Sequence, residues 1–151
     1  MAANSIRFIG LLLMSLLVGT MFGIWLGFNP SALTAATYVE QQQNAIRALS
    51  TALPALGAVC ILLTAVLAVL TKNEPRSRYL LIAAVVCLVT AGLITRFANQ
   101  PINSLVMTWS VQAPATNWME LRDTWWNWHI VRTVAGICAL SLTILAALGA
   151  R

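Results

Sequence analysis

The segment Asn117–Ala150, NWMELRDTWWNWHIVRTVAGICALSLTILAALGA, decides the fold of this chain. Its second part, Thr133–Ala150, is a run of 18 residues without a charged side chain. A helix of about 20 apolar residues crosses the hydrocarbon core of a bilayer. The first part holds four of the six tryptophans and the only histidine of the chain. We therefore expect a transmembrane helix with an aromatic and polar end.

The composition extends this expectation to the whole chain. Of its 151 residues, 60% are hydrophobic and 9% are charged, whereas soluble domains carry about 25% charged residues. Four charge-poor runs are long enough to span a membrane, at about residues 8–28, 48–71, 79–97 and 130–150. The expected fold is all-α, an integral membrane four-helix bundle that forms a single transmembrane domain, residues 1–151.

The basic residues flank these runs and predict the topology. Three of them crowd the short loop TKNEPRSR, Thr71–Arg78, and short cytoplasmic loops are enriched in lysine and arginine. We expect a bacterial inner-membrane protein with both termini in the cytoplasm and the first and third loops outside. The first run has an apolar core too long for a signal peptide, so we expect it to be retained as a span. Nothing in the charge pattern indicates nucleic-acid binding.

A glycine repeat marks the first expected helix, at Gly19, Gly23 and Gly27. Small residues at this spacing let another helix backbone approach closely. Tight packing within the bundle explains the repeat, and contact between two copies of the chain, in a homo-oligomer, is the alternative.

The second expected helix begins before the membrane. The pattern Thr37-x-x-Glu40 has the form of a capping box, which predicts a helix start near Tyr38. No helix breaker follows until Pro54, so this helix should project beyond the outer face. A polar face of this helix is either simply solvated or lines the mouth of a pocket, and it carries Glu40, Asn44, Arg47 and Thr51.

The third loop should contain a short helix of its own. Pro101 suits a first helical turn, with Asn99 or Gln100 as its cap. Ile102, Leu105, Val106 and Trp109 then follow at helical spacing, which predicts a helix on the membrane surface that ends by Pro114. Beyond it, Asn117-x-x-Glu120 should cap the fourth helix, expected from Trp118 to about Leu148.

The fourth helix carries a stripe of aromatic and basic residues. At 100° per residue its members fall within an arc of about 80°, and they are Trp118, Arg122, Trp125, His129, Arg132 and Gly136. Charged groups at the membrane boundary usually face the bundle or a wet cavity, which favours an inward stripe. The alternative is an aromatic belt at the membrane surface. Trp126 and Trp128 lie on the flanks and fit the belt.

This stripe could support acid–base chemistry on an aromatic ligand. Histidine titrates near neutral pH and is a natural general base, so His129 is the candidate base. Arg122 and Arg132 could stabilise an oxyanion or enolate. Tryptophan faces can stack on a flat ligand, and Asn99 and Asn103 could bond its carbonyl or hydroxyl.

A metal site is not expected. The chain has a single histidine, and its three cysteines lie within expected spans and form no Cys-x-x-Cys pair: Cys60, Cys87 and Cys138. Such cysteines usually act as small apolar residues, which argues against a disulfide-forming quinone reductase. Copper or iron held by His129 and Glu40 is the alternative.

Two segments, NQPINSLVMTW (Asn99–Trp109) and APATNWMELRDTWWNWHIVRT (Ala113–Thr133), resemble the motif region of the anthrone oxygenase-like family. Its members are small four-helix membrane proteins, most of them bacterial and of unknown function. The family pattern is Asn-x-Pro-x-Asn, a later tryptophan, and then Trp-x-x-x-Arg…Trp…His-x-x-Arg. Here it falls on Asn99, Pro101, Asn103, Trp109, Trp118, Arg122, Trp125 or Trp126, His129 and Arg132.

The resemblance implies an oxygenase that acts with dioxygen on a flat, lipophilic anthrone-, phenol- or quinol-like substrate, without an organic cofactor. His129 would remove the acidic C–H proton, while Arg122, Arg132 and Asn103 would hold the resulting oxyanion. The remaining candidates would bind the substrate, and they are Asn99, Trp109, Trp118, Trp125, Glu40, Asn44 and Arg47.

Two other functions fit the same residues. The first is a binding or transport protein for a quinone, a lipid or an aromatic small molecule, in which the stripe only recognises the ligand. Proton-coupled export is not expected, because none of the four acidic residues lies within a charge-free run. The second is a structural membrane subunit. The lipid bilayer is an expected partner in every case. A small aromatic ligand is expected for the oxygenase and for the binding or transport protein.

Overall fold

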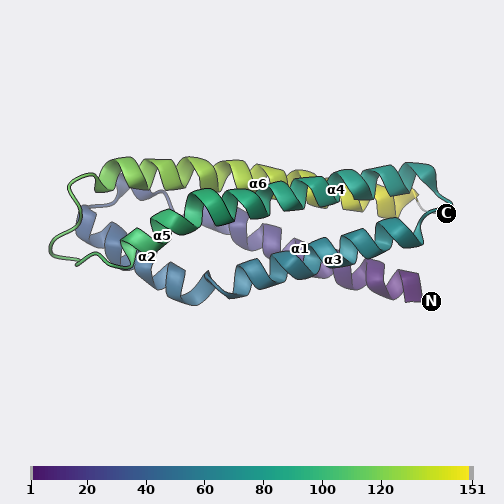
Figure 1. The fold of residues 1–151 in the computed structure, drawn as a ribbon, viewed down its shortest axis with the longest axis horizontal. Coiled ribbons are helices and arrows are strands. Elements are labelled where there is room, and N and C mark those ends of the chain that lie inside the picture. The colour runs from purple at the N-terminus through teal and green to yellow at the C-terminus, as the bar shows by residue number, and fades with distance from the viewer. Residues whose placement is uncertain (1, 150–151) are drawn as a thin grey trace.

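The computed structural model describes residues 2–149, with side chains from residue 4 onward. This part of the chain is helical and contains no strand. Figure 1 shows the helices running along one long axis. In chain order they are α1 (Ala2–Gly27), the 3₁₀ turn η1 (Pro30–Ala32), α2 (Ala35–Leu49), α3 (Ala52–Leu70), α4 (Pro75–Ile94), the π-helical turn η2 (Thr95–Asn99), α5 (Gln100–Val106) and α6 (Trp118–Gly149).

Four helical segments are long and apolar enough to cross a membrane, and they are Asn4–Ala32, Ala52–Leu70, Pro75–Val106 and Trp118–Gly149. They coincide with the four expected spans, so the prediction of a helical membrane bundle is confirmed. The chain is an integral membrane protein. The segment that contains α6 has 32 residues, about 48 Å of helix, and so exceeds a hydrocarbon core of about 30 Å.

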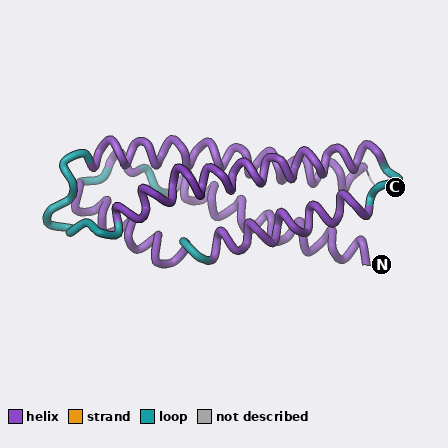
Figure 2. Tube along the Cα trace, viewed as in Figure 1, coloured by secondary structure: helices purple, strands orange, loops and turns teal. Residues whose placement is uncertain are grey.

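The four long helices form a bundle in which α1 and α4 each pack against both α3 and α6. Both termini lie at one end, and α2, α5 and the start of α6 lie at the other (Figures 1 and 2). The bundle core is apolar, and its buried members are Met14, Leu17, Val18, Met21, Cys60, Ala84, Leu88 and Ala139. Cys60 is thus a small apolar residue of the core, as predicted.

The second expected helix is two helices. The hydroxyl of Thr34 accepts a hydrogen bond from the Thr37 N–H at 3.4 Å, so α2 begins at Ala35 and the expected cap at Thr37 is wrong. The expected continuity up to Pro54 is also wrong, because α2 ends at Leu49 and α3 begins at Ala52. Proline lacks an N–H and clashes with the carbonyl four residues earlier, so Pro54 belongs in the first turn of a new helix.

A short helix is present after the third span, but it continues α4 instead of starting anew. The π-helical turn η2 joins α4 to α5, and Asn99 has helical backbone angles and forms no side-chain cap. The expected cap at Asn99 or Gln100 is therefore wrong. The helix ends at Val106, before Trp109, where the Gln43 amide donates to the carbonyls of Val106 and Trp109, both at 2.9 Å. This side chain satisfies carbonyls that a helix end leaves free.

The glycine of the α6 stripe packs against another helix, whereas the three glycines of the α1 repeat do not. A Cβ added to Gly136 of α6 would lie 3.4 Å from Val18 Cγ2, so the glycine lets α1 approach α6 closely. The repeat of α1 behaves differently: Gly19, Gly23 and Gly27 are exposed, with nothing within 4 Å of an added Cβ. Packing within the bundle does not explain this repeat, and the homo-oligomer stays a prediction.

Candidate active site

The stripe on α6 faces the interior of the molecule. Arg122, Trp125 and His129 are buried, with 8%, 5% and 0% of their surface exposed. Trp128 is exposed, as expected for a belt residue. The helix begins at Trp118, as predicted, and runs unbroken to Gly149, so the stripe has a rigid support.

His129 is bonded through both ring nitrogens. Its Nε2 lies 3.1 Å from the Met21 carbonyl oxygen of α1, and its Nδ1 lies 3.2 Å from Arg132 Nε and 2.9 Å from Arg132 Nη2. A guanidinium only donates hydrogen bonds, so Nδ1 must accept and Nε2 must carry the proton. His129 is therefore a neutral imidazole that ties α1 to Arg132.

Aromatic rings enclose this imidazole. Its ring is parallel to that of Trp125, with an interplanar angle of 2° and a centroid distance of 5.2 Å. Trp126 stacks with it at 19° and 5.7 Å. Phe28 then meets both indoles edge to face. These ring contacts, together with its three hydrogen bonds, fix the orientation of the His129 ring.

Arg132 connects this histidine to the π-helical turn. Its Nη1 donates to Thr95 Oγ1 at 3.1 Å, and that hydroxyl donates to the Ala91 carbonyl at 2.8 Å. The guanidinium also lies 5.9 Å from the ring centroid of Trp125. Unlike His129, Arg132 lines a cavity inside the bundle.

This cavity has a volume of about 630 Å³ and lies between α1, α2, α3, α4, η2, α5 and α6. Its wall is mostly apolar, with residues such as Leu17, Ile61 and Leu88. Arg96 and Arg132 are the charged residues of the wall, and no acidic residue is among the described residues that line it. The cavity therefore favours a lipophilic ligand that is neutral or negative. Four of the predicted site residues line it: Asn44, Asn103, Trp125 and Arg132.

The end of the cavity near α2 and α5 is polar. Gln42 is buried, and its Nε2 donates to Asn103 Oδ1 at 3.3 Å. Gln42 and Trp125 line the cavity, and Gln42 Oε1 and Trp125 Nε1 are buried without a partner among the described residues. Buried polar atoms are normally bonded, so unpartnered ones beside a cavity indicate a place for ligand or water atoms. Gln42 was missed from the sequence, where its only signal is its place in a run of three glutamines.

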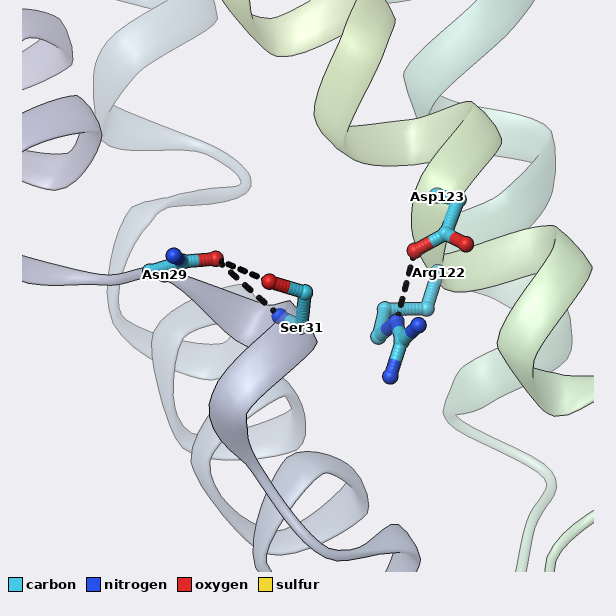
Figure 3. Close-up of polar contacts among 4 residues, drawn as sticks. All are labelled: Asn29, Ser31, Arg122 and Asp123. Atoms are coloured by element: carbon cyan, nitrogen blue, oxygen red, sulfur yellow. Dashed lines mark hydrogen bonds and ion pairs between the residues drawn. The ribbon is translucent and has the colours of Figure 1, made fainter.

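Arg122 does not line the cavity. Its Nε forms an ion pair with Asp123 at 2.8 Å (Figure 3). Its guanidinium lies 5.0 Å from the ring centroid of Trp118. Trp118 in turn packs against the buried ring of Tyr38. Burial raises the pKa of Tyr38, and the charge of Arg122 opposes this in part. Arg122 and Trp118 thus form part of the packing between α6 and α2 and do not line the cavity.

The remaining predicted residues are not brought to the cavity wall. Glu40 is exposed, and Arg47 donates to Gln43 Oε1 at 3.0 Å and to Asn44 Oδ1 at 3.2 Å. Trp109 packs in an apolar cluster, and Asn99 is fully buried with its Nδ2 donating to the Trp125 carbonyl at 2.9 Å. Among the described residues there is no group of three His, Cys, Asp or Glu side chains placed to hold a metal ion. Both nitrogens of His129 already have partners, so the geometry does not favour a metal on His129 and Glu40.

The fold defines an integral membrane four-helix protein with a largely apolar cavity between its helices. A family model described as anthrone oxygenase matches residues 41–142 of this chain. The match spans the cavity-lining segments from α2 to α6 and leaves out α1. The chain belongs to the anthrone oxygenase family, and the resemblance of its motifs is confirmed. No curated protein and no solved structure matches the chain.

Proposed function

We propose that this protein is a membrane-embedded oxygenase that oxidises a flat, lipophilic anthrone-, phenol- or quinol-like molecule with dioxygen. The observation that carries the proposal is the cavity itself, which is apolar, large enough for a polycyclic ligand, and charged only by Arg96 and Arg132. Membership of the anthrone oxygenase family supports it.

The chemistry of such a substrate fits a cationic wall. Loss of a proton from the carbon opposite the carbonyl of an anthrone spreads negative charge onto the carbonyl oxygen. Arg132 is preorganised by His129 and Thr95 to donate to that oxygen. Asn103, at the polar end, offers an amide for a ring hydroxyl or for the oxygen. Donors held in place for a developing oxyanion are usually the largest contribution to catalysis.

The proposed reaction balances without an organic cofactor. Water takes the proton that the carbon loses, and the carbanion carbon forms a bond to dioxygen. The resulting peroxide anion takes a proton back from water and becomes a hydroperoxide. Its O–O bond then breaks with loss of water, so the CH₂ group becomes a carbonyl. One oxygen atom stays in the product and the other leaves in the water. Dioxygen gains the four electrons that the carbon loses.

The structure changes the role that we propose for His129. Its Nδ1 accepts from Arg132, its Nε2 lies on the Met21 carbonyl, and it does not line the cavity. These bonds support His129 as a positioning residue that holds Arg132. General-base catalysis by His129, predicted from the sequence, requires Nδ1 to give up Arg132 first.

Oxygen uptake by the purified protein in lipid nanodiscs tests the proposal. Anthrone and a panel of quinols serve as substrates for the wild type, Arg132→Gln and Arg78→Gln. Arg78 is an exposed guanidinium near the start of α4, at the end of the bundle far from the cavity, and is the matched control. Removal of Arg132 should lower kcat about 100-fold, as for other oxyanion donors. Equal uptake by all three proteins, or none above the uncatalysed rate, would contradict the proposal.

A binding or transport protein is the second candidate. One observation favours it: the described residues of the cavity wall include no carboxylate and no free imidazole to accept a proton. A quinone or lipophilic aromatic molecule would then bind without turnover. Quenching of tryptophan fluorescence by such a ligand, with no oxygen uptake, would support this function.

We further propose an orientation of the bundle in the membrane. Both termini and the loop that carries Lys72 lie at one end of the bundle (Figure 1), which would face the cytoplasm of a bacterium. The cavity and the segment 107–117 lie toward the other end and would face outward.

A further inference from the structure

A second hollow adjoins the cavity. It is a groove of about 300 Å³, and Pro101, Ser104 and Met107 of α5 and its end form its outer rim. The other residues of the groove also line the cavity, and they are Ile46, Ser50, Arg96, Gln100 and Asn103. The groove and the cavity therefore share a wall, between the end of α2 and the segment η2–α5.

Two irregularities of the chain create this opening. The helix α2 ends at Leu49 and α3 begins at Ala52, so Ser50 lies at a break and not inside a packed helix. On the other side, η2 widens the helix by one residue and places Arg96 at the opening.

Arg96 is the unusual residue of the shared wall. It lies within an apolar span, yet it is exposed and has no hydrogen bond or ion pair among the described residues. Its guanidinium lies 5.8 Å from the ring centroid of the neighbouring Phe97. Arg132, by contrast, is bonded to His129 and Thr95. A charge in a span without a protein partner usually serves a ligand or reaches the lipid headgroups.

We propose that the groove is the entrance to the cavity and that Arg96 binds an acidic oxygen of the incoming molecule. The substrate is then an aromatic amphiphile with a carboxylate or an acidic phenol, in addition to the group that reacts deeper in the cavity. This proposal rests on the proposed function for the identity of the cavity as the substrate site. A lipid phosphate is the other source of an anion for Arg96.

Ligand binding to the full chain in nanodiscs tests whether Arg96 recognises an acidic group on the ligand. The probes are anthraquinone and anthraquinone-2-carboxylate, and quenching of tryptophan fluorescence gives the dissociation constants. The wild type should prefer the carboxylate by about tenfold, the worth of one charge-assisted hydrogen bond. Arg96→Gln should bring this ratio close to one, while the control Arg78→Gln keeps it. Added salt should lower the ratio in the wild type, because ions screen an exposed charge.

A second pair of variants tests the route. Ser104→Phe places a ring in the groove, whereas Leu105→Phe places the same ring at an exposed position of α5 that lines neither hollow. Stopped-flow quenching should show an association rate about tenfold slower for Ser104→Phe with both probes. The rate for Leu105→Phe should stay near that of the wild type. Equal rates for the two variants would show that ligands enter elsewhere.

The outcomes separate this proposal from the proposed function. An Arg96-dependent preference without oxygen uptake supports the entrance and contradicts the oxygenase. Oxygen uptake with equal ratios in wild type and Arg96→Gln supports the oxygenase and overturns the role of Arg96. The preference ratios of the wild type and Arg96→Gln should also be equal if Arg96 binds only lipid phosphate, whether the nanodiscs contain zwitterionic or anionic lipid. Failure of the wild type to bind either probe overturns the entrance as proposed.

Discussion

The arginine at position 132 shows how a charge is kept inside this membrane protein. Three of its N–H groups donate to His129 Nδ1 and Thr95 Oγ1, and its plane lies near the ring of Trp125. These bonds leave the outer N–H of each terminal nitrogen without a partner among the described residues. A half-buried guanidinium with spare donors beside a cavity is preorganised to bind an anion.

Substitution of His129 separates its two candidate roles. In His129→Gln the side-chain oxygen can accept from Arg132 and the amide can donate to Met21, so positioning survives but a base does not. His129→Leu removes both the positioning of Arg132 and the base. If His129 positions Arg132, the glutamine variant should keep kcat within about tenfold of the wild type and the leucine variant should lose about 100-fold. Equal loss in both variants, with unchanged ligand affinity, would instead identify His129 as the base.

Thr95 offers a smaller test of the same arrangement. Thr95→Val removes the hydroxyl that bonds Arg132 but keeps the shape of the side chain. We expect kcat to fall about tenfold, close to the worth of one hydrogen bond to a charged group. Thr90→Val is the control, since the hydroxyl of this exposed residue bonds only the Val86 carbonyl of its own helix. Steady-state oxygen uptake measures both, and equal rates would exclude a role for the Thr95 hydroxyl.

Residues on one helix could be predicted from the sequence, and their partners could not. Helical spacing alone brings Trp125, His129 and Arg132 to one face of α6. Met21 and Thr95 come from two other segments, and only the packing of the whole chain brings them to that face. The same packing brings Gln42 to Asn103. Arg122 shows the converse, because it shares the face of the stripe but lies far enough toward the helix start to pack against Trp118 outside the cavity.

The two irregular elements decide what the cavity wall contains. From the sequence we expected one continuous helix through the region before Pro54 and a separate helix starting near Pro101, and the structure shows the reverse at each place. One proline begins a new helix after a break, whereas the other is carried through by the π-helical turn η2. Both arrangements accommodate a proline, which has no backbone N–H to donate, so the local sequence does not decide between them.

Removal of one residue from η2 tests its importance. A π-helical turn is an α-helix with one inserted residue, so deletion of Ala98 should restore a regular helix. The segment α5 would then rotate by about 100° relative to α4 and carry Asn103 and Gln100 away from the cavity. We expect an unchanged helix content by circular dichroism but at least a tenfold weaker affinity for anthraquinone. Deletion of Gln112, in the connection before α6, is the control and should preserve the affinity.

At the scale of the whole molecule, four apolar segments were predicted correctly, because length and composition alone determine whether a helix spans a membrane. The order in which they pack, with α1 and α4 on opposite sides of α3 and α6, depends on side-chain packing. So does the cavity, which hydropathy does not reveal.

The proposed orientation is testable in intact bacteria. A single cysteine at Gln112, in the connection between α5 and α6, should react with a membrane-impermeant maleimide added outside the cell. A cysteine at Asn73, between α3 and α4, should react only after the cells are opened. Both would be placed in a background in which the three native cysteines are replaced by alanine. Labelling in the reverse pattern would place the cavity end in the cytoplasm.

The two guanidiniums of the cavity wall imply a change of colour. Hydroxyanthraquinone dyes are yellow while their hydroxyl holds its proton and red to violet once it is lost. Nearby cations without an acidic neighbour stabilise the ionised dye, so a dye bound between Arg96 and Arg132 should ionise in more acidic buffer than the free dye. Membranes that contain the protein would then turn red in a solution that is itself still yellow.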